Sequence, residues 1–146
     1  MRPLLVGELN PYGIDPQWAL YPLPENASGG RLRKILQMSI PQYIGTFDRK
    51  NLCYGKWSNP EARAEARVIQ ASKDHEIIIL LGSKVCQAFG VQYKPFERLG
   101  RYLVLPHPSG RCLAWNDPTS AERARRLVQD ALEGKNDGYQ ADPGGG

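Results

Sequence analysis

Two short apolar runs, one near each end of the chain, are each followed directly by a polar turn. Residues 4–6 are Leu-Leu-Val and lead into a turn that contains Glu8 and Asn10. Residues 102–105 are Tyr-Leu-Val-Leu and lead into His107-Pro108-Ser109-Gly110. In an open α/β sheet, a ligand binds in the crevice outside the carboxyl ends of the strands. We therefore expect both runs to be strands of one sheet and the two turns to share one pocket.

Two further polar residues lie at candidate strands between these ends. Asn51 belongs to the short segment 48–53, and Ser83 comes shortly after the continuous apolar run at residues 77–81. An uninterrupted apolar run bounded by charged residues and glycine is typical of a strand that is covered on both faces. All four strands are therefore expected to present polar groups at a single edge of the sheet.

Segments with helical features alternate with these strands. Helices are expected at residues 31–38, from a Ser58 cap to about residue 72, from a Ser83 cap to Gly90, and from Asp117 to about residue 133. A polar cap followed by an early proline supports the second and the last of them. Alternating strands and helices predict a three-layer α/β/α fold with a central four-stranded parallel sheet in the order 2-1-3-4.

The length of 146 residues, with 41% apolar and 23% charged residues, fits one soluble globular domain. We place this domain at residues 1–134 and expect the Gly/Asp-rich segment 135–146 to be a disordered tail. The sequence shows no signal peptide and no apolar stretch near the ~18 residues of a membrane helix. We expect a monomeric cytoplasmic or nucleoid-associated protein without membrane contact. The formal charge of +4 fits a polyanionic partner and equally fits an ordinary soluble surface.

The three cysteines, Cys53, Cys86 and Cys112, are scattered along the chain without a C-x-x-C spacing. This pattern argues against a disulfide framework, a structural zinc site and a four-thiolate iron–sulfur cluster. We therefore expect a reducing compartment, no metal and no cofactor.

The two polar turns also carry a family resemblance. Asn10-Pro11-Tyr12 resembles the water-activating motif of the uracil-DNA glycosylase superfamily, and His107-Pro108-Ser109-Gly110 resembles its second motif. The segment from Leu80 to Cys86 is similar to the strand-to-helix turn of the same family. Either motif alone is a weak signal, whereas both in this order are fairly specific. The resemblance covers residues 4–132. It is nearest to the single-strand-selective type of the family, in a small variant without an iron–sulfur cluster.

The resemblance implies a hydrolase of base excision repair that removes uracil or a related modified pyrimidine from DNA and leaves an abasic site. Asn10 and His107 would be its catalytic residues. Asn10 would orient the attacking water through its amide oxygen, and neutral His107 would donate to the base carbonyl on which negative charge develops. An amide cannot act as a full base, so we expect slow chemistry.

The resemblance also implies contacts to single- or double-stranded DNA from which the pyrimidine is extruded. Asn51 would read the base edge, Tyr21 would stack on the base, and Tyr12 would wall off its 5-position. Ser83, Ser109 and Gly110 would contact phosphates. Arg111 would fill the vacated stack, with Leu113 as the apolar alternative.

Glu8 departs from the family pattern, which usually has glycine two residues before the water-activating position. Since side chains at i and i+2 share one face of a strand, Glu8 is expected to face the same pocket as Asn10. Three roles stay open for it: orienting a neighbour, setting specificity, or activating water itself.

Each candidate residue also has a purely structural interpretation. Asn10 with Pro11 suits a strand-ending turn, Asn51 can satisfy backbone groups, and Tyr12 and Tyr21 can cover the core. Two functional alternatives also stay open. One is a catalytically weak module of the same fold that binds DNA or a modified base, and the other is a relative that processes hypermodified pyrimidines.

Overall fold

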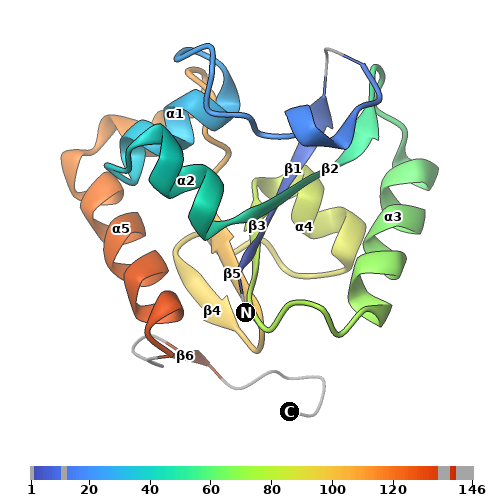
Figure 1. Ribbon diagram of the computed structural model, residues 1–146. Coiled ribbons are helices and arrows are strands. Elements are labelled where there is room, and N and C mark those ends of the chain that lie inside the picture. The colour runs from blue at the N-terminus through green and yellow to red at the C-terminus, as the bar shows by residue number, and fades with distance from the viewer. Residues whose placement is uncertain (1, 11–12, 135–138, 141–146) are drawn as a thin grey trace.

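The computed structural model describes residues 2–10, 13–134 and 139–140. A central sheet of six strands has the order β2-β1-β3-β5-β4-β6 (Figure 1). The strands are β1 (Leu4–Asn10), β2 (Asp48–Tyr54), β3 (Ile78–Leu81), β4 (Glu97–Leu99), β5 (Tyr102–Leu105) and β6 (Tyr139–Gln140). The neighbouring pairs among β2, β1, β3 and β5 are parallel, whereas β4 runs antiparallel to β5. The predicted α/β class with a mostly parallel sheet is confirmed.

The predicted four-stranded, all-parallel sheet in the order 2-1-3-4 is wrong in its detail. The fourth predicted strand is β5, and two further strands extend the sheet beyond it. β4 has only three residues, Glu-Arg-Leu, so its sequence carries no alternating apolar pattern. It reaches β5 through a tight turn in which Gly100 has a φ of +58°, a conformation that favours glycine. Within residues 135–146 the structure describes only β6, which pairs with β4.

Helices cover both faces of the sheet (Figure 1). One face carries α3 (Asn59–Ala71) and α4 (Ser83–Phe89), and the other carries α1 (Ser28–Ile35), α2 (Ile40–Thr46) and α5 (Pro118–Leu132). Two short 3-10 turns, η1 (Pro16–Trp18) and η2 (Leu113–Asn116), lie in the connections. None of the helices in the described part of the chain has the length and apolar character needed to cross a membrane.

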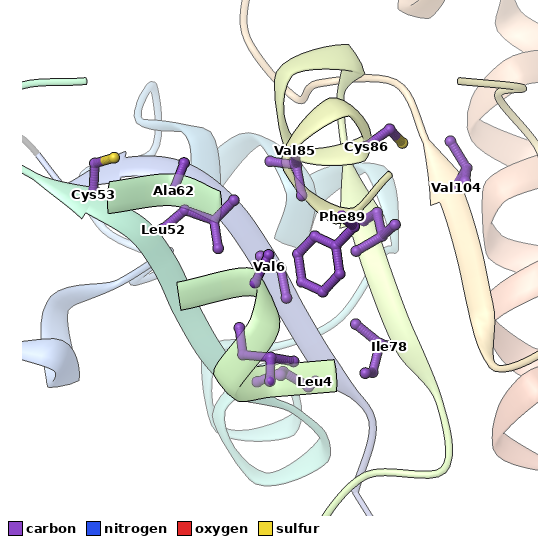
Figure 2. Packing of buried hydrophobic residues seen from close by; sticks show 13 residues of the cluster. Leu4, Val6, Leu52, Cys53, Ala62, Ile78, Val85, Cys86, Phe89 and Val104 are labelled. Carbon is purple, nitrogen blue, oxygen red and sulfur yellow. The ribbon is translucent and has the colours of Figure 1, made fainter. Parts of the chain in front are cut away.

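Alternate residues of the buried strands pack into two separate hydrophobic cores, one on each face of the sheet. Leu4 and Val6 pack with α3 and α4, as Figure 2 shows, while Leu5 of the same strand packs with α1 and α5. The run Ile78–Leu81 is buried throughout and contributes to both cores in the same alternating way. This two-sided burial explains why the central strands are continuously apolar.

The helix starts agree with the sequence in part. Side chains of Ser58 and Asp117 accept from backbone N–H groups and begin α3 and α5, as predicted. Ser83 does not cap α4, because the cap residue is Gly82, whose φ of +97° suits glycine. α1 begins at Ser28, three residues before the predicted start at residue 31. The predicted elements also omit α2, which Ser39 begins with a reciprocal capping box.

Candidate functional site

A cavity of about 830 Å³ opens at the carboxyl end of β1 and just beyond that of β5. This is the upper edge of the sheet in Figure 1. Its walls come from the strand ends, from the segment 18–31 and from the turn that follows His107. Glu8, Asn10, Asn51 and His107 all line it. At this cavity, polar residues at the ends of β1 and β5 therefore meet Asn51 from the middle of β2.

Asn10, the last residue of β1, is 1% exposed. Its Nδ2 donates to the backbone oxygen of Asp15 at 3.4 Å, and its own backbone oxygen accepts from the N–H of Gly55. The first bond sets the direction of the carboxamide, and the second holds the strand end against the segment after β2. Asn10 thus presents an oriented amide to the cavity.

Asn51 lies in β2 opposite Gly7 of β1 and is 3% exposed. Its carboxamide makes no hydrogen bond with any other residue that the structure describes. A Cβ atom on Gly7 would lie 2.5 Å from Oδ1 of Asn51, so only glycine leaves room for this amide. Neither amide atom of Asn51 is among the buried polar atoms that lack a hydrogen bond, so the amide is open to the cavity. Since Asn51 lines the cavity, a ligand there can supply the missing partners.

His107 faces Glu8 across the end of β3. Their Nε2 and Oε2 atoms are 3.8 Å apart, and each side chain is 25% exposed. A Cβ atom on Gly82 would lie 3.1 Å from Cβ of His107 and 3.5 Å from Oε2 of Glu8, so a glycine at the end of β3 leaves space for both. The Nε1–H of Trp115 donates to the backbone oxygen of His107 at 2.9 Å and fixes this turn.

Burial lowers the pKa of His107 below its ordinary 6.5. The Glu8 carboxylate opposes this effect, and the Lys84 ammonium adds to it. The imidazole is therefore neutral at pH 7, with one nitrogen able to donate and the other able to accept. A neutral donor beside a cavity suits an uncharged ligand that develops negative charge.

Tyr21 lines the cavity, and two neighbouring side chains contact its ring. Trp18 meets it edge-on with ring centroids 4.9 Å apart, and the Arg49 guanidinium lies 5.5 Å from its centroid. Trp18 also lines the cavity and is 44% exposed, and the sequence analysis does not identify it as a site residue. Its position depends on how the segment after β1 folds back, for which the sequence carries no local signal. Tyr12 lies outside the described residues.

The turn after His107 forms one wall through Ser109, Gly110 and Arg111. Leu113, the alternative to Arg111, is 77% exposed in η2. Ser83 is not brought to the site, because it is an exposed residue at the start of α4 and does not line the cavity. The structure adds Arg31, which sequence reasoning missed because its helix position gives no sign that it reaches the turn of Gly110.

Within the described ranges, no group of three or more His, Cys, Asp or Glu side chains is arranged to hold a metal ion. The chain was compared with protein-family models, with curated proteins and with solved structures, and none of these matches it.

Proposed function

We propose that this protein is a DNA glycosylase that hydrolyses the N-glycosidic bond of uracil or a related modified pyrimidine and leaves an abasic site. The observation that carries the proposal is the amide of Asn51, which makes no hydrogen bond within the described part of the chain and lines the same cavity as Asn10 and His107. A carboxamide offers one acceptor and two donor hydrogens, which match the ring N–H and a carbonyl of uracil; with its oxygen turned toward the ring nitrogen, the same amide mismatches cytosine.

Asn10 and Asn51 line the cavity and are only 1% and 3% exposed, so a base that stays stacked in a duplex would not reach them. The target nucleotide is therefore taken from single-stranded DNA or extruded from a duplex. Arg111 is exposed and lines the cavity, where it can occupy the space that the base leaves; Leu113, exposed two residues further along the chain, is the apolar alternative. The Tyr21 ring, fixed by Trp18 and Arg49, supplies an aromatic surface for stacking.

In the reaction, a water oxygen forms a bond to C1′ of the sugar as the bond between C1′ and the base nitrogen breaks. The electron pair of the broken bond leaves with the base, whose carbonyl oxygen gains negative charge. Neutral His107 donates a hydrogen bond to that oxygen, and Asn10 accepts one from the water and aims it at the sugar. The base finally takes up a proton, and solvent receives the proton that the water loses.

A panel of oligonucleotides tests this function. Uracil, 5-hydroxymethyluracil and related modified pyrimidines are placed in single and double strands, incubated with the protein and a chelator, and treated with alkali. Strand breaks at the modified position are expected for at least one of these bases. If every oligonucleotide stays intact, the proposal is wrong.

A second candidate, a module that binds a modified base without cleaving it, is favoured by Glu8. Its carboxylate lies 3.8 Å from His107, where it repels an anionic leaving group and opposes catalysis. As an acceptor, it also favours a base that bears a donor substituent, which the cavity has room to hold. Salt-dependent binding of an oligonucleotide without abasic product would support this candidate.

A further inference from the structure

Arg31 of α1 holds a fixed position at the rim of the cavity. Its Nε–H donates to the backbone oxygen of Asn26 at 3.0 Å. A Cβ atom on Gly110 would lie 2.8, 2.9 and 3.1 Å from Nη2, Cζ and Nη1 of Arg31. These nearly equal distances mean that the guanidinium lies flat against Gly110. Two parts of the chain that are far apart in sequence therefore meet at this contact.

The charge of Arg31 is not compensated by any carboxylate within ion-pair distance among the described residues. The nearest acidic residue on this surface, Glu25, pairs instead with Lys34 at 3.0 Å and with Arg33 at 3.7 Å. With Nε bound and its face covered, Arg31 keeps the N–H groups of Nη1 and Nη2 for a further acceptor. A planar pair of donors of this kind matches two oxygens of a phosphate group.

Arg31 also lies between two hollows. It lines the large cavity and, with Glu25, Asn26 and Lys34, a second groove of about 320 Å³. Because Glu25 and Lys34 neutralise one another, the net charge of this groove is that of Arg31. A polyanionic chain that leaves the cavity toward the groove passes this guanidinium.

We propose that Arg31 binds a phosphodiester group next to the nucleotide held in the cavity, and that the groove carries the strand onward. This inference rests on the proposed function, since it takes the cavity ligand to be part of a DNA strand. Gly110 serves the site by leaving room for the guanidinium. A free nucleotide presents a similar phosphate, so the test separates a terminal phosphate from a phosphodiester.

The test measures binding of a fluorescent single-stranded oligonucleotide whose target uridine carries a 2′-fluorine, which slows cleavage by disfavouring a positively charged sugar. Arg31→Gln should weaken binding about tenfold at low salt. It should also reduce the slope of log affinity against log salt concentration by about one. Arg31→Lys should keep the slope but lose part of the affinity, because an ammonium lacks the planar pair of donors. Arg67→Gln, an equal charge change on an exposed residue of α3, should have little effect.

Neutral methylphosphonate groups locate the phosphate. For the wild-type protein, one methylphosphonate next to the target nucleotide should weaken binding as much as Arg31→Gln does. The affinity of Arg31→Gln should not change further with the same methylphosphonate. An Arg31 effect that appears with deoxyuridine monophosphate but not with the oligonucleotide would overturn the phosphodiester assignment. Equal affinities of wild type and Arg31→Gln, or no binding by the wild type, would also overturn it.

Gly110→Ala provides an independent variant. Gly110 does not have a left-handed backbone, and the three atoms nearest to the added methyl group all belong to the guanidinium of Arg31, so the chain should fold and the guanidinium should be displaced. The loss of DNA affinity caused by Gly110→Ala should be absent when Arg31→Gln is already present. Additive losses would contradict the shared site. If the wild-type protein forms an abasic product but Arg31→Gln binds DNA as well as the wild type does, this inference alone is wrong. If binding depends on Arg31 but no abasic product forms, only the proposed catalysis is wrong.

Discussion

The carboxylate of Glu8 and the imidazole of His107 lie 3.8 Å apart at the ends of β1 and β5, with the end of β3 between them. Two opposing influences act on the imidazole. Burial and Lys84 lower the pKa of His107, while Glu8 raises it, and burial has the largest effect. The balance of these influences sets the pH at which His107 takes up a proton.

Glu8→Gln should lower the pKa of His107 further, because the substitution removes the one contribution that raises it. Proton NMR titration can follow both imidazoles, since the chain has only two histidines. His75, which contacts Asp48, serves as the internal control. A midpoint for His107 that is unchanged or higher in the variant would contradict this electrostatic account.

The lowered pKa of His107 also makes the stability of the folded protein depend on pH. Since the folded-state pKa of His107 lies below 6.5, the unfolded chain binds more protons in the window between the two values. Stability should therefore fall as the pH drops from 6.5 toward the folded-state pKa, and His107→Gln should weaken this dependence. Chemical denaturation at several pH values measures it, and an equal pH dependence in both proteins would exclude His107 as its source.

His107→Ala removes a positioned donor to the leaving base and Asn10→Ala removes the acceptor that orients the water. Each should reduce cleavage of the best oligonucleotide by about 10² or more. Single-turnover rates at saturating protein separate chemistry from binding. Circular dichroism shows whether each variant is folded. Unchanged rates in both folded variants would remove these residues from the mechanism.

Gly7→Ala should damage base recognition, because its methyl group would meet Oδ1 of Asn51 at 2.5 Å and Cδ2 of Leu20 at 2.9 Å. Overpacking of this kind costs about 1–3 kcal/mol of stability. Gly45→Ala is the matched control, since nothing lies within 4 Å of its added methyl group, and alanine favours helix α2. Thermal melting and oligonucleotide affinity should fall for the first variant only. Equal behaviour of the two would mean that Gly7 does not make room for Asn51.

The central strands can be predicted from the sequence because strands that are buried on both faces are continuously apolar. Residues 77–81 and 102–105 are continuously apolar, and capping residues mark the starts of α3 and α5. The strand β4 has no such apolar run, since Glu97 and Arg98 occupy two of its three positions. Its place in the sheet depends on pairing with β5 after a turn, which is a tertiary effect.

The site could be anticipated only where strand ends define it. Asn10 and His107 follow from the rule that parallel strands end at one edge, whereas Asn51 lies in the middle of β2; all three line the cavity. Trp18 and Arg31 reach it through the return of the segment after β1, which no periodicity encodes. Ser83 obeys the same edge rule but stays outside the cavity, as α4 begins at Gly82 and leaves Ser83 exposed.

Asn51→Leu separates a binding role from a structural one. Leucine has the same number and branching of side-chain heavy atoms as asparagine but a larger volume, and the amide that it replaces makes no hydrogen bond within the described residues. The cavity beside residue 51 gives the larger side chain room, so the free energy of unfolding should change little. Base recognition should be lost, because no donor or acceptor then faces the base edge. Urea unfolding and oligonucleotide cleavage measure the two effects, with Asn59→Leu on the surface as a control for composition. Asn59 bonds to Trp57 outside the cavity, so its replacement should leave cleavage unchanged. A large loss of stability in Asn51→Leu would instead assign the amide to the fold, and retained cleavage would remove it from base reading.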